Sequence, residues 1–153
     1  MVEHSLETVP QNFGTILSKP PTRCVIVVDQ DLPAGRLVNA VAVIALTIGQ
    51  RHPILVGESL VDGSGFAHPG LIPIGITILA AAQSELPEIR QKGLETSCDV
   101  IDFPVEGQQT KNYQIFCETV AALQPEVMKY TGVALVGQKK EINKIVGKLA
   151  LLN

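Results

Sequence analysis

The chain has 153 residues, the size of one ordinary domain. Hydrophobic residues make up 46% of it and charged residues 18%, a balance that excludes an intrinsically disordered protein. Aromatic residues are only 4%, with no tryptophan, and the formal net charge is -3. Nucleic-acid binding is therefore disfavoured, because it depends on clustered Lys and Arg and on aromatic side chains that stack with bases.

The sequence lacks the features of a membrane span or a secretion signal. Its longest apolar runs, 40–48 and 71–82, are shorter than the roughly 18 residues that cross a bilayer. The three cysteines have no zinc-site or dithiol spacing, which is typical of free thiols in a reducing compartment. We therefore expect a cytoplasmic protein with a polar N-terminal arm at 1–21 and a single α/β domain over 22–153.

The first elements of the expected domain are a strand and a helix. Residues 24–29 are mostly β-branched and apolar, which is typical of a strand buried on both faces. A turn follows at 31–35. Residues 36–50 are then apolar almost all round, so we expect a helix that is buried on every side.

The remaining sequence alternates between strand and helix patterns. Residues 54–57 and 59–61 are strand-like, and Asp62-Gly63-Ser64-Gly65 is a strong turn sequence before 66–68, which together predict a β-hairpin. Further strands are expected at 74–79, 99–103, 133–136 and 148–152, and helices at 84–96, 111–128 (bent or restarted at Pro125) and 138–146. This order predicts an α/β sandwich with a mixed sheet.

Two turns each place a glycine and a cation where a helix starts. The first contains Asp31, Gly35 and Arg36, and the second contains Gly137 and Lys140. Helix N-termini bind anions, and glycine allows a close approach of the ligand. We expect the two turns to face one crevice and to bind a small ligand there. An anionic ligand is one of the two forms of this hypothesis, and a neutral ligand is the other. The alternative is that the glycines serve the turns and the cations are solvated.

Three further side chains are expected near the same opening. Asn39 lies in the first turn of the apolar helix, and Asn143 and Lys144 lie one to two turns into the second helix. Asn39 either faces the ligand or bonds the neighbouring turn.

Metal chemistry has little support in the sequence. Asp29 and Asp31 could bind a divalent metal, but such residues more often close a turn or cap a helix. The three histidines, His4, His52 and His68, have no metal-ligand spacing, and we assign them to surface or turn positions. We expect no metal and no cofactor.

Both ends of the chain resemble a known enzyme family. Residues 131–137 and 142–152 resemble the C-terminal signature of type 2 peptidyl-tRNA hydrolases, and 25–35 resembles their N-terminal signature. Residues 29–35, with Asn39-Ala40, Val56-Gly57 and Asp62-Gly63, resemble more closely the uncharacterised bacterial family known as domain of unknown function 2000. That family is grouped with the hydrolase by fold, which implies a three-layer α/β/α sandwich with a mixed sheet.

The residues that would carry hydrolysis are replaced. The resemblance places a functional lysine of the hydrolase at Val38, and a glutamine and a histidine at Ala42 and Ala45. The acidic residue and the threonine of the C-terminal signature fall on Asn143 and Val146, and only Lys144 remains. Ester cleavage needs a cation and a polarising hydroxyl or carboxylate, so we expect no peptidyl-tRNA hydrolase activity.

The expected function is therefore that of a non-hydrolytic relative that binds a small molecule or a protein partner. The alternative is a hydrolase or transferase with a rebuilt site in the same cleft. Association with tRNA is disfavoured by the charge. We also expect a homodimer, because the resembled hydrolases are dimeric and the apolar helix needs cover, although the helix at 111–128 could provide that cover within one chain.

Overall fold

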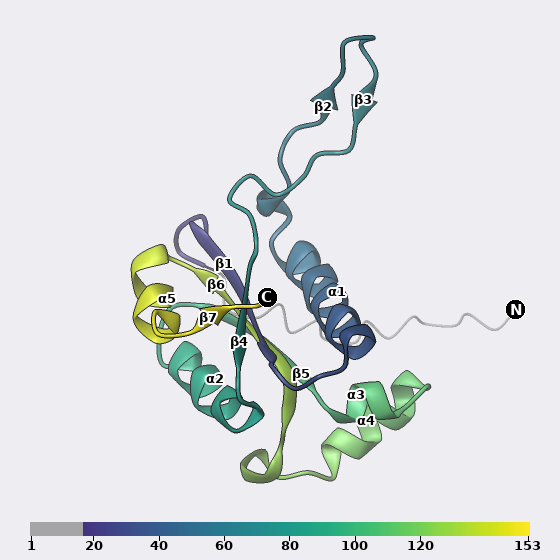
Figure 1. Ribbon diagram of the computed structural model, residues 1–153, viewed down its shortest axis with the longest axis vertical. Helices are drawn as coiled ribbons and strands as arrows, with labels where there is room; N and C mark the ends of the chain where they lie inside the picture. The colour runs from purple at the N-terminus through teal and green to yellow at the C-terminus, as the bar shows by residue number, and fades with distance from the viewer. Residues whose placement is uncertain (1–16) are drawn as a thin grey trace, which may run out of the picture.

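The computed structural model describes residues 17–153 and builds them around a five-stranded mixed sheet (Figure 1). Across the sheet the strands are β5 (Asp99–Pro104), β6 (Tyr130–Gly137), β1 (Arg23–Asp29), β4 (Thr77–Ala81) and β7 (Ala150–Leu151). β1 pairs parallel with β4, and every other pair is antiparallel. The expected α/β class with a mixed sheet is confirmed.

Helices cover both faces of the sheet (Figure 1). α1 (Ala34–Arg51) packs on one face, where α3 (Glu106–Gln109) and α4 (Tyr113–Ala121) adjoin it. α2 (Leu86–Leu94) and α5 (Lys139–Val146) pack on the other face. β1 and β6 contribute side chains to both cores, because alternate residues of a strand point to opposite faces. The predicted strand at 24–29 is therefore buried on both faces, as expected.

The segment between α1 and β4 leaves the body of the protein. Residues 53–76, here called the extension, begin with a 3-10 turn, η1 (Pro53–Leu55), and carry a two-stranded hairpin of β2 (Leu60–Val61) and β3 (Ala67–His68). Figure 1 shows the hairpin projecting beyond the end of α1. The predicted hairpin is confirmed, but residues 54–57 are not a strand, since Pro53 starts a helical turn there.

Two further 3-10 turns flank the helices of the domain. η2 (Gln83–Glu85) leads into α2, and η3 (Pro125–Val127) follows α4. The helix expected at 111–128 is thus two pieces, because Pro125 cannot continue α4. The part of the N-terminal arm at 1–16 lies outside the described residues, whereas residues 17–21 lie beside Gly137 and Gln138.

The prediction that the first helix is buried on every side is wrong. Only Ala40, Ile44 and Ile48 of α1 are buried. The opposite side, here called the outer face of α1, consists of residues spaced three or four apart, namely Gly35, Val38, Ala42, Leu46 and Gly49. Its two largest side chains, Val38 and Leu46, are 65% and 78% exposed. The apolar sequence of a helix does not show whether its faces are covered by the same chain or are left exposed for contact with another molecule. Among the described helices, none is both long and apolar enough to cross a membrane.

Candidate functional site

The carboxyl ends of three parallel strands meet at one end of the sheet. β1, β4 and β5 run in the same direction, because β1 is parallel to β4 and both β1 and β5 are antiparallel to β6. After β1 the chain enters α1 on one face, and after β4 it enters α2 on the other. Ligands of open α/β sheets bind where neighbouring connections part in this way, so this carboxyl end is the first candidate site.

Asp29 closes the turn at this end. Its side chain is buried, Oδ1 accepts a hydrogen bond from the backbone N–H of Asp31 at 3.0 Å, and Oδ2 accepts one from Gln83 Nε2 at 3.4 Å. The side chain of Asp31 is exposed. This arrangement matches the turn-closing alternative of the sequence analysis. Within the described part of the chain, no group of three or more His, Cys, Asp or Glu residues could hold a metal ion.

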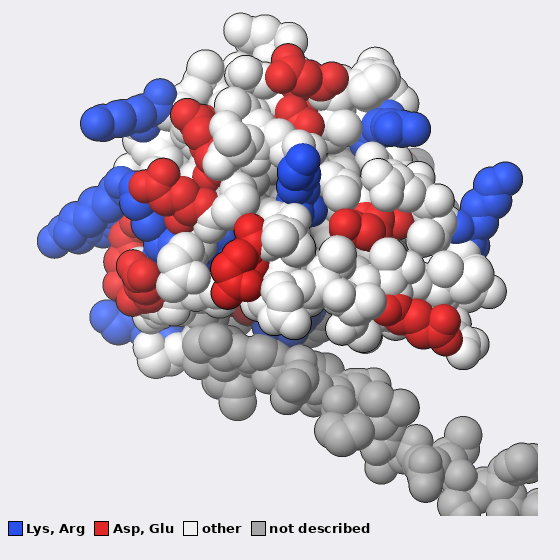
Figure 2. Space-filling view, turned by 90° about the horizontal axis from the view of Figure 1, so that it is seen from below, with Lys and Arg blue, Asp and Glu red and all other residues white. Residues whose placement is uncertain are grey.

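The first turn of α1 is held by α3. Gln108 Nε2 donates to the backbone carbonyl of Arg36 at 2.7 Å and to Asn39 Oδ1 at 3.2 Å. The side-chain oxygen of Asn39 therefore accepts a bond from α3, and not from the neighbouring turn that the sequence suggested. Figure 2, which views the molecule from this end, shows acidic and basic side chains interspersed over the surface. Among the described residues, this face therefore lacks the patch of one sign that would attract an extended polyanion.

The second predicted turn lies at the opposite end of the sheet. Gly137 pairs with Arg23, the first residue of β1, whereas Gly35 follows the last residue of β1. The prediction that the two turns face one crevice is wrong, because β6 runs antiparallel to β1 and its carboxyl end lies beside the start of that strand. Asp31, Gly35, Arg36 and Asn39 are at one end of the sheet. The other four predicted residues, Gly137, Lys140, Asn143 and Lys144, follow β6 at the other end.

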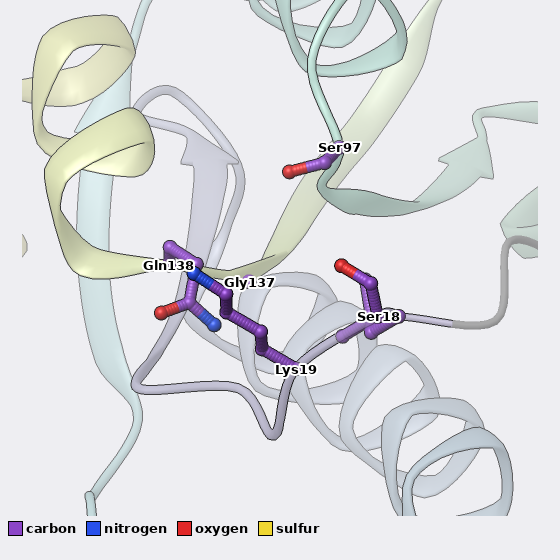
Figure 3. Close-up of a pocket in the computed structure, with 6 residues that line it drawn as sticks. Ser18, Lys19, Ser97, Gly137 and Gln138 are labelled. Carbon is purple, nitrogen blue, oxygen red and sulfur yellow. The ribbon is translucent and has the colours of Figure 1, made fainter.

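The start of α5 is already occupied by the chain itself (Figure 3). The backbone N–H of Lys139 donates to Thr22 Oγ1 at 2.9 Å, and Gln138 Nε2 donates to the carbonyl of Pro20 at 2.9 Å. The hollow between these segments is about 10 Å³, lined by Leu17, Ser18, Lys19, Ser97, Gly137 and Gln138. A cavity of that size holds about one water. Lys140, Asn143 and Lys144 point no ligand group into it and are exposed.

A second hollow lies between α3 and α4. It has a volume of about 220 Å³ and is lined by Gly107, Thr110, Lys111, Asn112, Tyr113 and Phe116. Ligand pockets are usually larger, about 300–1,000 Å³, and enclose most of their ligand. Tyr113, which is 79% exposed, leaves this hollow open on one side. Neither hollow has the enclosed shape of a substrate site.

The structure also contains a buried ionic cluster that the sequence analysis missed. Asp99, at the start of β5, accepts hydrogen bonds from Arg51 Nε at 2.8 Å and from Arg51 Nη2 at 2.7 Å, and its Oδ2 lies 2.6 Å from His52 Nε2. Burial alone would raise the pKa of Asp99, but the bonds from Arg51 and His52 outweigh it and lower that pKa. His52 and Arg51 lie 47 and 48 positions from Asp99 along the chain, so no local spacing could have revealed the cluster.

This cluster holds the end of α1 against β5. Among the residues that the structure describes, no Ser, Thr or Cys side chain forms a hydrogen bond with it. Cys24 lies in the core on the same side of the sheet, and burial raises the pKa of its thiol to about 11. A thiol with that pKa is protonated at neutral pH and is a poor nucleophile. The cluster is therefore a structural clamp, and we assign no reaction to it.

Most of the large hydrophobic side chains that are exposed among the described residues lie in two consecutive segments. Of fifteen large hydrophobic side chains that are exposed among the described residues, ten lie between Val38 and Ile74, on α1 or the extension. On the extension they are Ile54, Val56, Leu60, Val61, Phe66, Leu71 and Ile74, and on α1 they are Val38, Val43 and Leu46. The two segments are consecutive in the chain and adjoin in space (Figure 1). We call this combined region the apolar surface.

The comparisons with known proteins agree with the fold and assign no activity. A family model described as "Protein of unknown function (DUF2000)" matches residues 22–153. The solved structure of a protein of unknown function, Atu0240 from Agrobacterium tumefaciens, has a TM-score of 0.77 and 23% sequence identity, and the match covers 84% of this chain and 96% of that one. A comparison with curated proteins gave no significant match.

Proposed function

Because the chain belongs to the DUF2000 family, whose description states no activity, we propose from its geometry that it is a non-catalytic protein-binding domain. Its binding site is the apolar surface formed by α1 and the extension. The observation that carries the proposal is the exposure of ten large hydrophobic side chains in one stretch of 37 residues, 38–74. Exposed apolar surface of this extent usually marks a contact with another macromolecule.

Hydrogen bonds within the hairpin support a role in which it holds its apolar side chains out toward a partner. Asp62 Oδ1 accepts hydrogen bonds from Ser64 N at 2.8 Å, Ser64 Oγ at 2.6 Å and Phe66 N at 3.1 Å. Asp62 Oδ2 lies 3.0 Å from His68 Nε2, and the rings of His68 and Phe66 meet edge to face. The bonds from Ser64 and His68 lower the pKa of Asp62 to about 2, so the turn keeps its charge at any physiological pH. A two-stranded hairpin is marginally stable alone, and these contacts fix its shape.

The root of the extension is also fixed. Gly57 N donates to the carbonyl of Leu71 at 2.8 Å, and a Cβ on Gly70 would lie 1.9 Å from the carbonyl oxygen of Gly57. The two sides of the extension thus approach so closely that only glycine fits at position 70. Ile72 and Ile76 then pack against the core beneath α1. The extension therefore holds its exposed side chains in one orientation relative to α1.

The resemblance to type 2 peptidyl-tRNA hydrolases supports the same surface. The positions that would carry the hydrolase's functional side chains on its first helix hold Val38, Ala42 and Ala45 here. Two of these, Val38 and Ala42, belong to the outer face of α1. In this proposal, a helix that bears reactive groups in the resembled enzymes has become an apolar contact surface.

An enzyme with a rebuilt site is the weaker alternative. It would use Asp29, Asp31 and Asn39 at the carboxyl end of the sheet, but Asp29 and Asn39 are bonded to neighbouring groups. A small ligand at the start of α5 would need to displace Thr22 from the Lys139 N–H. We therefore favour a protein partner over a small molecule.

Photo-crosslinking in the cells that make this protein tests the proposal. A benzoylphenylalanine placed at Leu46 or at Phe66 reports what lies against each half of the apolar surface. A matched control has the same group at Leu94 of α2, which is 50% exposed but lies outside that surface. We expect adducts of discrete mass from positions 46 and 66 and none from position 94. Absence of adducts from both 46 and 66 contradicts the proposal.

A further inference from the structure

We infer that the partner is a second copy of this chain, with the extension of each copy laid across the outer face of α1 of the other. This inference rests on the proposed function, because it names what covers the same apolar surface. It follows from how that surface is divided, sized and charged within one chain.

The apolar surface has two parts that do not cover each other. Val38 and Leu46 on the outer face of α1 are 65% and 78% exposed, and Val61 and Phe66 on the extension are 68% and 62% exposed. The extension does not fold back onto α1 but continues outward beyond the end of that helix (Figure 1). A two-fold axis places the extension of each copy on the outer face of α1 of the other copy. The dimer then has two equal contacts, which together cover both extensions and both α1 helices.

The size of the surface fits a stable dimer. Nineteen residues of the extension and nine of α1 are exposed. A standard protein interface uses about 20–30 residues on each side, which is about the number that the two segments expose on all their sides together. Its apolar side chains include one aromatic, Phe66, near the tip, where it can act as an anchor.

The charges are compatible with self-association. The extension contains Glu58 and Asp62 and has no Lys or Arg, while α1 has no acidic residue and only Arg36 between its first residue and Arg51. Placing the extension on α1 of a second copy therefore brings no like charges together. A strongly charged partner would find no counter-charges on the outer face of α1.

The alternation of small and large side chains on the outer face of α1 also suits contact with the hairpin. Gly35, Ala42 and Gly49 alternate with Val38 and Leu46 along the outer face. A Cβ at Gly35 or Gly49 would meet no atom of the chain within 4 Å, so the space above both glycines is open. These small residues leave shallow gaps between two aliphatic ridges, into which apolar side chains of a second copy's extension can fit.

The mass of the purified protein at micromolar concentration tests the inference. We expect about twice the 16.4 kDa of one chain by light scattering. Leu46→Lys and Val61→Glu should each weaken association by at least about a hundredfold, because each variant buries an unpaired charge in the contact. Leu94→Lys, on α2, is the control and should leave the mass unchanged. A wild-type mass of 16.4 kDa at all concentrations overturns the inference.

Mixing the two charged variants tests the exchange of extensions. In an exchanged dimer, one contact joins the new Lys on α1 to the new Glu on the extension, and the other contact is wild type. The mixture should therefore form a heterodimer, although neither variant associates alone. If the mixture stays monomeric, the exchanged arrangement is wrong.

The crosslinking experiment separates this inference from the proposed function. Adducts of twice the chain mass from positions 46 and 66 support both. Adducts of another mass, together with a monomeric purified protein, support the proposed function and overturn the second copy as partner. Absence of adducts together with a monomer overturns both.

Discussion

At the scale of single residues, two carboxylates of β5 bind cations from the helices that cover the sheet. The Asp99 side chain is 4% exposed and is shared by Arg51 and His52, whereas the Asp102 side chain is 28% exposed and is bonded by Arg90 at 2.6 Å. Both carboxylates lie on β5, and both bond to a helix that covers the sheet. They differ in burial, which determines how much each pair contributes to stability.

Asp99→Ala should lower the free energy of unfolding by about 2–4 kcal/mol, because it leaves Arg51 and His52 without their buried acceptor. Asp102→Ala is the matched control on the same strand, and its cost should be about 1 kcal/mol or less. Urea unfolding of the two variants measures both values. Equal costs would show that the Asp99 cluster is no clamp.

The lowered pKa of Asp99 predicts how its contribution to folding stability changes at acidic pH. Because the pKa of Asp99 is lower in the folded chain than in the unfolded one, its stabilisation is present above the unfolded pKa of about 3.9 and is lost as pH falls through the folded value. The difference in unfolding free energy between wild type and Asp99→Asn should therefore shrink as the pH falls below about 4. A difference that does not shrink below about pH 4 contradicts this assignment.

At the scale of elements, the sequence predicted what local patterns can encode. The turn residues Asp62 and Gly65 predicted the hairpin, and the structure uses Asp62 as an acceptor and Gly65 at a φ of 85°. The direction of β6 was beyond local patterns, since a strand pattern reads the same for parallel and antiparallel pairing. That direction separated the residues of the candidate site, Gly35 and Gly137 among them, to opposite ends of the sheet.

The extension offers a test of its own rigidity. Gly70→Ala should open its root, because the added Cβ would lie 1.9 Å from the carbonyl oxygen of Gly57. Gly63→Ala is the control, since nothing lies within 4 Å of the new Cβ there. We expect Gly70→Ala to speed proteolysis within residues 56–72 by about tenfold and Gly63→Ala to leave it nearly unchanged. Similar rates for the two variants would mean that the root is not closely packed.

At the scale of the whole molecule, the candidate residues are divided between the two ends of the sheet. Val38, Ala42 and Ala45 of α1 offer no cation, acid or base, and Asn143 and Lys144 lie at the other end of the sheet from Asp31. The two sets of candidate residues therefore cannot act on one bond.

The purified protein should release tRNA from a model peptidyl-tRNA no faster than the uncatalysed background. The reason is that the positions which the resemblance assigns to the hydrolase's functional side chains on this helix hold Val38, Ala42 and Ala45, none of which can polarise an ester. Single-turnover assays at micromolar protein measure the rate. Cleavage well above background that Lys144→Ala abolishes would mean that a rebuilt catalytic site exists.

The central claim is that another protein surface covers the outer face of α1 in the working protein. The most direct measurement is the rate of thiol labelling in the cells that make it, for Leu46→Cys and Leu94→Cys on a Cys117→Ser background. Cys117 is the exposed native cysteine, and Cys24 and Cys98 are buried. In a single chain Leu46 is 78% exposed and Leu94 is 50% exposed, so an uncovered α1 would label at least as fast as the control. We predict that Leu46→Cys labels at least about tenfold more slowly than Leu94→Cys, and equal or faster labelling at position 46 would contradict the claim.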